Sequence, residues 1–442
     1  MPSILIKAVD VITLNDAGDV LRGVDIAIEG GAIVAVGQAS PGFLAGEVLD
    51  GTDLVALPGF WNAHTHAAMT FERSLGDDLP LDRWFNEKIW VAERALSADD
   101  VEWGAYLAAA EMIRSGTVGF ADHYFHMERV AEVVEKSGLK ALLAWCVFGL
   151  SSEAGTELSG AVDFARRFQG AAGGRIKTCL GPHAPYTCPP EFLKTVGETA
   201  RKEGIGVHIH LSETDEQVEA SRKRHGRTPP AHLDALGLLD VPGQKLAAHC
   251  VAVTEEDTAI LADRGVSVAQ CPGCHMKLGM GVTPVPSLLA RGVNVALGTD
   301  GPASNNNLDM LEEAQLAALL QKSHLRDAEA LPGDTVLRLA SRNGARALGF
   351  EASGVIAPGA AADIILLDFR RPHLRPRNSL VGNIVYSARS SDIRHSIIAG
   401  RLVMKDHELL TLDEERILWE AERRAFAMLA RARGTALREY HG

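Results

Sequence analysis

The chain has 442 residues, of which 46% are hydrophobic and 23% charged, with 43 glycines and 19 prolines. This composition excludes a disordered or collagen-like chain, and a chain of this size buries roughly three quarters of the surface that its unfolded form exposes. Lysine and arginine total 44 against 57 aspartates and glutamates, and the net charge of −13 argues against nucleic acid or an anionic membrane as a partner.

The sequence shows no sign of secretion or membrane insertion. No charged leader precedes an apolar stretch at residues 1–11, and the longest apolar run, residues 141–150, is far below the roughly 18 residues needed to span a bilayer. The six cysteines are scattered without the spacing of a secreted domain, so we expect free thiols. We therefore expect a cytoplasmic protein, and the sequence leaves both a monomer and a homo-oligomer open.

The two ends of the chain predict short β-strands. In residues 1–53, apolar and polar residues alternate around Gly and Asp turns, with strands expected at 4–6, 9–14, 24–28 and 32–36. In residues 353–442, strands are expected at 363–367, 384–386, 393–398 and 401–404, followed by a helix over 412–439. We predict that both ends pair into one small β-sandwich domain.

Between them, residues 54–352 have a different pattern. Apolar β-branched runs alternate with long stretches of helical period, and eight strands are predicted at 54–60, 117–124, 140–148, 176–182, 205–211, 245–251, 265–271 and 292–299. Each intervening segment is long enough for a helix, which implies parallel crossovers. The sequence therefore predicts an α/β fold with a (β/α)₈ barrel of the TIM type.

Histidines and acids stand where these predicted strands end, and the catalytic groups of such barrels lie at that mouth. In His64-Thr65-His66 the two imidazoles are two residues apart on extended backbone, so both face one side and can share a metal. His210 ends strand five and Asp300 ends strand eight. Four N and O ligands with an open position suit a hydrolytic Zn²⁺, and ligand type also allows iron or manganese.

Several motifs carry a resemblance to a known family. Residues 58–66 (PGFWNAHTH), 210–213 (HLSE), 248–249 (AH) and 298–301 (GTDG) resemble the mononuclear aminohydrolase branch of the amidohydrolase superfamily, over essentially the whole chain. Residues 304–310 (SNNNLDM) and 181–186 (GPHAPY) resemble, more narrowly, the methylthioadenosine/S-adenosylhomocysteine deaminases.

The resemblance implies which residues bind the metal and which take part in catalysis. It implies that His64, His66, His210 and Asp300 bind a divalent metal. Only one metal is expected, because strand four ends in Gly-Pro-His where binuclear relatives carry a carboxylated lysine. A bound cation lowers the pKa of a water molecule enough to give hydroxide at neutral pH. Glu213 then moves the water's proton to a ring nitrogen, His249 hydrogen-bonds the hydroxide, and Asp300 also passes a proton to the departing ammonia.

Substrate contacts follow from the same resemblance. His183 and Glu93 are expected to reach a purine nucleoside, Glu93 at the ribose hydroxyls; for Glu93 an exposed helical acid is the alternative. His123 and His126 are expected to line the rim of the pocket. His208 is expected to face away from the metal and to be structural.

The chain departs from the family pattern after strand three. Relatives that bind S-adenosylhomocysteine place arginines there, whereas this chain has Trp145 and then Glu157. We therefore predict an uncharged substrate that contacts Trp145, such as methylthioadenosine, adenosine or a flat heterocycle. Cys271 and Cys274 form a lone CxxC, expected in a mouth loop near the substrate, with half of a zinc site or a redox pair as alternatives.

The sequence thus predicts a metal-dependent hydrolytic deaminase that releases ammonia from an amino-substituted purine-type small molecule. Amino- or chlorohydrolases of pterins, guanine-type bases or s-triazines are the alternatives within the branch. A non-catalytic barrel that acts as an interaction protein is the alternative from another class.

Overall fold

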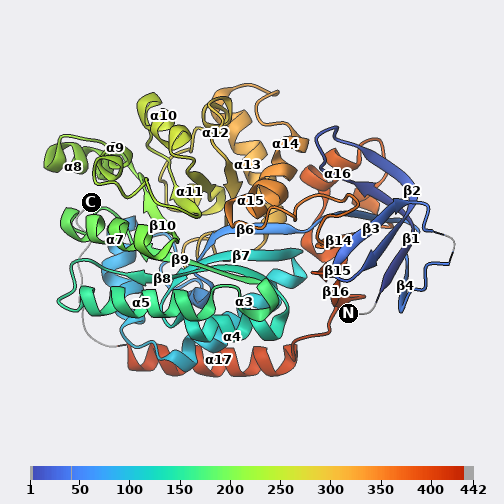
Figure 1. Cartoon of the computed structure of the whole chain (residues 1–442), viewed down its shortest axis with the longest axis horizontal. Coiled ribbons are helices and arrows are strands. Elements are labelled where there is room, and N and C mark those ends of the chain that lie inside the picture. The colour runs from blue at the N-terminus through green and yellow to red at the C-terminus, as the bar shows by residue number, and fades with distance from the viewer. Residues whose placement is uncertain (1–2, 41, 433–442) are drawn as a thin grey trace.

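A computed structural model describes residues 3–40 and 42–432 of the chain. Eight parallel strands form one sheet in the order β13-β12-β11-β10-β9-β8-β7-β6, with helices packed around it (Figure 1). The strands are β6 (Phe60–Thr65), β7 (Thr117–Tyr124), β8 (Lys140–Val147), β9 (Ile176–Pro182), β10 (Gly206–Leu211), β11 (Lys245–His249), β12 (Ser267–Gln270) and β13 (Val295–Leu297). The predicted (β/α)₈ barrel is confirmed.

The hydrogen-bond ladder ends at β6 and β13. Thr299 and Asp300, which follow β13, bond to residues of β6 across the gap. The backbone N–H of Asp300 donates to the carbonyl of His64 (3.0 Å), and that of Thr299 donates to Oδ1 of Asn62 (3.0 Å). The amide of Asn62 in turn donates to Oγ1 of Thr299 (2.7 Å). A buried side chain thus replaces the missing ladder bonds.

Helical segments connect the barrel strands and cover the sheet. Helices α3 and α10 begin with a capping box, in which Ser97 and Thr254 each accept from a backbone N–H three residues on. The segments are η1 (Ala67–Glu72), α1 (Leu81–Arg83), η2 (Trp84–Ile89), α2 (Trp90–Glu93), α3 (Ala98–Arg114), α4 (Met127–Ser137), α5 (Ala154–Phe168), α6 (Ala171–Gly174), α7 (Pro190–Glu203), α8 (Asp215–His225), α9 (Pro229–Ala235), α10 (Glu255–Asp263), α11 (Pro272–Lys277), α12 (Val285–Ala290), α13 (Met310–Leu325), α14 (Gly333–Arg338), η3 (Leu339–Asn343) and α15 (Gly344–Ala347).

Strands from both chain ends form a second, mixed sheet with its own apolar core, at the right of Figure 1. Its order is β17-β16-β15-β14-β5-β1-β2-β3, and β4 pairs with β1. The strands are β1 (Ile4–Ile12), β2 (Val20–Glu29), β3 (Ala32–Gly37), β4 (Glu47–Asp50), β5 (Leu54–Pro58), β14 (Ile364–Asp368), β15 (Ile393–Ile398), β16 (Arg401–Lys405) and β17 (Glu408–Leu409). The two ends therefore fold together as predicted, in one continuous sheet.

Two predicted strands differ from the structure. The strand expected at 54–60 is divided at Gly59: β5 belongs to the terminal sheet, whereas β6 begins the barrel. A Cβ at Gly59 would lie 2.1 Å from Cγ1 of Val118, so only glycine fits this crossing point. The strand expected at 384–386 is wrong, because these residues lie in α16 (Leu380–Ser387), whose N-terminus is capped by Ser379.

The remaining C-terminal segments lie on the outside of the molecule. Two short turns, η4 (Pro372–Leu374) and η5 (Ser390–Asp392), flank α16, and α17 (Glu414–Arg431) runs along the barrel beside α3 (Figure 1). The predicted helix over 412–439 thus corresponds to α17 up to Arg431, and residues 433–439 lie outside the described residues. Among the helices of residues 3–40 and 42–432, none combines the length and the apolarity that crossing a membrane requires.

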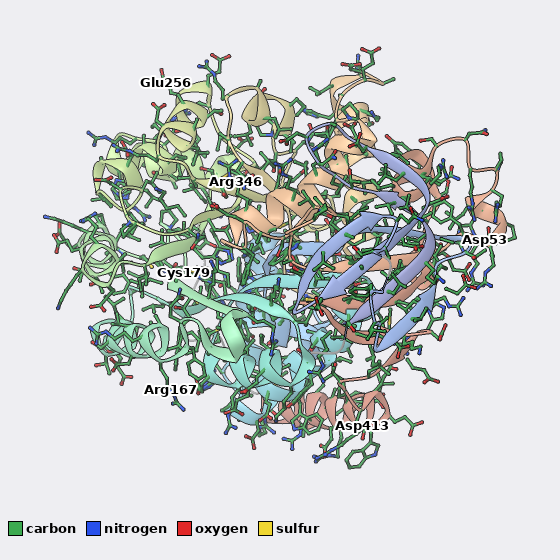
Figure 2. All side chains as sticks on the ribbon, turned by 45° about the vertical axis from the view of Figure 1, so that its right-hand side comes forward. Asp53, Arg167, Cys179, Glu256, Arg346 and Asp413 are labelled. Atoms are coloured by element: carbon green, nitrogen blue, oxygen red, sulfur yellow. The ribbon has the colours of Figure 1, made fainter. Side chains whose placement is uncertain are left out.

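Charged side chains crowd the surface (Figure 2), whereas most buried side chains are apolar. Asp53, in the turn before β5, and Glu256 on α10 point outward, and Cys179 of β9 lies among the barrel strands. A buried ion pair also lies between the two sheets: Nζ of Lys140 on β8 contacts Oδ2 of Asp363. Ser353 donates to the same carboxylate oxygen (2.6 Å), and the N–H of Ala399 donates to Oδ1 (2.8 Å).

Removing one partner of this ion pair is expected to destabilise the fold strongly. Lys140→Met leaves the Asp363 carboxylate buried without a cation, which costs about 3–5 kcal/mol of unfolding free energy in urea titrations. The double variant Lys140→Met/Asp363→Asn should recover much of that loss, and Lys405→Met, at the surface pair with Glu47, should change little. A Lys140→Met variant as stable as the Lys405→Met control would contradict the assignment.

Candidate active site

A pocket opens at the carboxyl ends of the barrel strands, where the sequence places its histidines. Its wall combines aromatic side chains with titratable groups. The lining residues include His66, Trp84, Phe85, Trp90, Glu93, His123, Tyr124, Phe148, His183, His210, Glu213, His249, Asp300 and Ser304. An apolar cavity with a few convergent polar groups is the usual form of a small-molecule site.

Four of the predicted site residues meet at the floor of this pocket. Nε2 of His66 lies 3.2 Å from Oδ1 of Asp300 and 3.2 Å from Nε2 of His210. Nε2 of His64 lies 3.4 Å from the same Asp300 oxygen, and all four side chains are buried. We refer to His64, His66, His210 and Asp300 as the ligand cluster.

Backbone carbonyls orient two imidazoles of the ligand cluster. Nδ1 of His66 is 2.6 Å from the carbonyl oxygen of His123, and Nδ1 of His210 is 2.8 Å from that of His183. A carbonyl oxygen can only accept, so each Nδ1 carries a proton, and in the neutral form of each ring Nε2 is the nitrogen that keeps a lone pair. This is the arrangement that metal-binding histidines require.

His208 orients the third imidazole, and here the prediction from the sequence was wrong. Residues two apart on a strand share a face, so His208 points into the barrel beneath His210 rather than away from it. Its Nε2 lies 2.9 Å from Nδ1 of His64. His208 therefore supports the ligand cluster from below without entering it.

The charges of the ligand cluster suit a cation. Burial lowers the pKa of His64 well below its usual value and that of His210 to about 4, so both rings are neutral. Burial acts to raise the pKa of Asp300, but the closeness of His64 and His66 outweighs it and holds that pKa well below the usual range. A buried carboxylate that faces three imidazoles therefore provides the negative charge.

A nitrogen without a hydrogen-bond partner indicates that the ligand cluster fits a divalent metal. Within residues 3–40 and 42–432, Nε2 of His64 is buried and has no hydrogen-bond partner, although it points at the centre of the ligand cluster. An orphaned buried nitrogen is costly unless something else binds it. Three imidazole nitrogens and one carboxylate oxygen are the donors that catalytic zinc sites use, with a position left open.

The second oxygen of Asp300 is held by residues from two other segments. Ser304 donates to Oδ2 (2.7 Å), and so does the thiol of Cys274 (3.0 Å). Cys274 and Cys271 are both buried, and burial raises the pKa of both thiols, so they stay protonated. The pair expected near the substrate thus lies behind the ligand cluster, and Cys274 positions Asp300.

Glu213 stands beside the ligand cluster in a setting that suits proton transfer. It is 3% exposed, and burial raises its pKa to about 7 although Tyr186 donates to its Oε1 (3.0 Å). A carboxyl group that titrates near neutrality can both accept and return a proton. Tyr186 lies in the GPHAPY motif, but the sequence alone did not indicate its contact with Glu213.

His249 faces the ligand cluster from the end of β11. Its ring centroid is 5.3 Å from that of His64 and 5.5 Å from that of His210, and burial lowers its pKa well below the usual value. Its Nδ1 lies 3.1 Å from Nε2 of His275, a residue that the sequence analysis did not single out.

The backbone is unusual at three of these strand ends. Ser212, His249 and Asp300 have φ values of 51°, 75° and 61°, in the left-handed region that side-chain-bearing residues rarely adopt. Such conformations cost about 1–3 kcal/mol each and persist where the surrounding structure enforces them. They lie where strands β10, β11 and β13 turn into the mouth of the pocket.

The predicted substrate residues lie higher in the pocket. Nδ1 of His183 lies 2.9 Å from Oγ1 of Thr187, and the His183 ring stacks on Phe148 with centroids 4.5 Å apart. Glu93 borders both this inner pocket and an outer one. The outer pocket is lined by Trp90, Glu93, Arg94, Leu96, Phe125, His126, Trp145, Cys146 and Glu157.

Arg94 adds a positive charge to the outer pocket that the sequence did not predict there. The sequence has Trp145 and Glu157 where relatives place arginines, but Arg94, from the end of α2, lines the same outer pocket. Both histidines expected at the rim line a pocket, His126 the outer one and His123 the inner one, but His123 is buried, with its ring centroid 5.0 Å from that of His210. The sequence could not show that the end of α2 brings a cation to the pocket that Glu157 also lines.

Comparisons with known proteins agree with this geometry. The model of the "Amidohydrolase family" matches residues 55–403. The chain belongs to the amidohydrolase family. A 5-methylthioadenosine/S-adenosylhomocysteine deaminase of Pelotomaculum thermopropionicum is 48% identical over 98% of this chain and all of its own length, and a 5'-deoxyadenosine deaminase of Methanosarcina mazei is 45% identical over 98% and 99%.

Solved structures of two zinc-containing enzymes share the fold. An adenosine deaminase from Xanthomonas campestris with bound zinc superposes with a TM-score of 0.92 at 33% identity, covering 97% of this chain and 98% of that one. An atrazine chlorohydrolase from Arthrobacter aurescens, complexed with zinc, gives a TM-score of 0.87 at 23% identity, covering 96% and 100%. At that lower identity the likeness concerns the fold alone.

Loss of one imidazole should abolish metal binding. His66→Ala removes one of the three ligand nitrogens, so we expect the metal content, measured by elemental analysis after dialysis, to fall from about one ion per chain to near zero. The control His126→Ala changes a histidine of the outer pocket and should retain the ion. Equal metal contents in the two variants would show that the ligand cluster is not the metal site.

Proposed function

We propose that the protein is a zinc-dependent hydrolytic deaminase that releases ammonia from adenosine-type nucleosides. The observation that carries the proposal is the convergence of a cation-binding ligand cluster, Glu213 and His249 in one buried pocket. The names of the relatives, deaminases of 5-methylthioadenosine, S-adenosylhomocysteine and 5'-deoxyadenosine, support the substrate class. The zinc bound by the Xanthomonas adenosine deaminase supports the choice of ion.

The proposed chemistry is the replacement of the C6 amino group by oxygen. When bound, a divalent ion supplies the Lewis acidity that makes a water molecule nucleophilic near neutral pH. Glu213 accepts a proton of this water and returns it to the neighbouring ring nitrogen, and Tyr186 holds the carboxylate in place through its hydrogen bond (3.0 Å). His249, neutral in its buried position, accepts a hydrogen bond from the water.

Release of ammonia needs one more proton transfer. We assign this step to Asp300, whose Oδ2 already accepts hydrogen bonds from Ser304 and Cys274. The carboxylate takes the second proton of the attacking water and gives it to the leaving amino group. One water is consumed, the C6–N bond breaks, and the products are ammonia and the 6-oxo nucleoside.

We assign three regions of the pocket to three parts of the substrate. The inner pocket, with the stacked pair of His183 and Phe148, takes the purine. Glu93 borders both pockets, and we assign it to the ribose hydroxyls that lie between the base and the 5' substituent. The outer pocket takes the 5' substituent against Trp145, with Arg94 and Glu157 at its wall. Because one cation and one anion face this space, we retain an uncharged substituent as the proposal.

The proposed substrate class is tested by ammonia release from zinc-loaded protein. We expect turnover of methylthioadenosine, 5'-deoxyadenosine and adenosine, and a lower kcat/KM for S-adenosylhomocysteine. Activity confined to pterins, guanine-type bases or aminotriazines would keep the metal chemistry but refute the nucleoside assignment. Release from none of these compounds would refute the deaminase.

Glu213→Gln should separate chemistry from metal binding. The amide keeps the size of the side chain but cannot accept the proton, so ammonia release should fall by about 10²–10⁴-fold while the metal content stays unchanged. Glu216→Gln, at an exposed acid three residues further along, is the matched control and should keep full activity. Full activity in Glu213→Gln would remove this residue from the proton path.

A further inference from the structure

His275 is a buried histidine to which the proposed chemistry gives no part. It lies in α11, directly after the CxxC pair, and has no exposed surface. Its Nε2 faces Nδ1 of His249 at 3.1 Å, and its Nδ1 faces Oγ1 of Thr283 at 3.5 Å. The three side chains therefore form a chain that ends at the ring facing the ligand cluster.

The donors and acceptors of this chain fix its protons. Oγ1 of Thr283 donates its hydrogen to the carbonyl oxygen of His249 (2.9 Å), so towards His275 it can only accept. Nδ1 of His275 therefore carries the proton, and its Nε2 is an acceptor. Burial lowers the pKa of His275 to about 4, so the ring is neutral and has one N–H only.

The position of the proton on His275 determines the position of the proton on His249. Because Nε2 of His275 accepts, Nδ1 of His249 carries the hydrogen of the 3.1 Å bond, and the other nitrogen of the neutral ring is bare. We propose that His275 is a positioning residue, which holds His249 in the tautomer whose unprotonated Nε2 faces the ligand cluster and can accept a hydrogen bond from the attacking water. This inference rests on the proposed function, because that function assigns the water.

A metal held behind the active site is the competing explanation. Ligand atoms of His249, Cys271 and His275 lie within 4.8 Å of one another. Three of the four histidine nitrogens in this group already have a hydrogen-bond partner, so a metal bound there would have to break the bond between His249 and His275. We therefore favour the hydrogen-bonded chain, and metal counting decides between the two.

Two variants of His275 separate positioning from packing. The amide oxygen of Gln reaches about as far as Nε2 of His and can accept from His249, whereas Leu fills similar space and cannot accept. We expect His275→Leu to lower kcat on the nucleosides by about 10–100-fold at nearly unchanged KM, with one metal ion retained. His275→Gln should stay within a few-fold of the wild type. Equal losses in both variants would refute the positioning role.

A spectroscopic readout is independent of turnover. In metal-loaded protein with ¹⁵N-labelled histidine and no substrate, we expect an Nδ1–H signal of His249 in the wild type and in His275→Gln, and its loss in His275→Leu; His249→Gln assigns the signal. An Nε2–H tautomer in the wild type would overturn the inference. So would two metal ions per wild-type chain with one lost in His275→Gln. If the wild type releases no ammonia, the proposed function fails, and the NMR signal still decides the tautomer.

Discussion

The site depends on one constraint: its imidazoles are buried, and burial disfavours their charged form. Burial lowers the pKa of His64, His123, His208 and His249 well below the usual value. A neutral imidazole has a single N–H, so whatever accepts it decides which nitrogen is free. In this chain the acceptors of His66 and His210 are backbone carbonyls at the ends of β7 and β9. The barrel backbone itself therefore determines where the lone pairs point.

The barrel is in turn held by contacts outside the pocket. The terminal sheet buries Asp363 against Lys140 of β8, and Asn62 joins β6 to the residues after β13. Both contacts are buried and polar, so they require a defined geometry rather than a general apolar fit. They fix the spacing of strands whose ends carry the ligand cluster.

Much of this arrangement could be predicted from the sequence, because parallel strands and their C-terminal residues leave strong patterns. Periodicity failed at residues 384–386, where a short apolar run suited a strand as well as the helix α16 that it joins. It failed again for His208, whose face was misjudged although the strand was located correctly. Tyr186, Arg94 and His275 were missed for another reason: their roles arise from contacts between segments far apart in the chain. No local pattern records such contacts.

The place where the barrel closes has a thermodynamic consequence. His64 and His66 belong to or follow the first barrel strand, and Asp300 follows the last, so a cation bound by them would span the seam where the ladder is interrupted. Opening of the seam and release of the ion are then linked, and the free energy of opening rises with the free metal concentration. The stability of the barrel and the catalytic activity would thus both depend on the concentration of free metal.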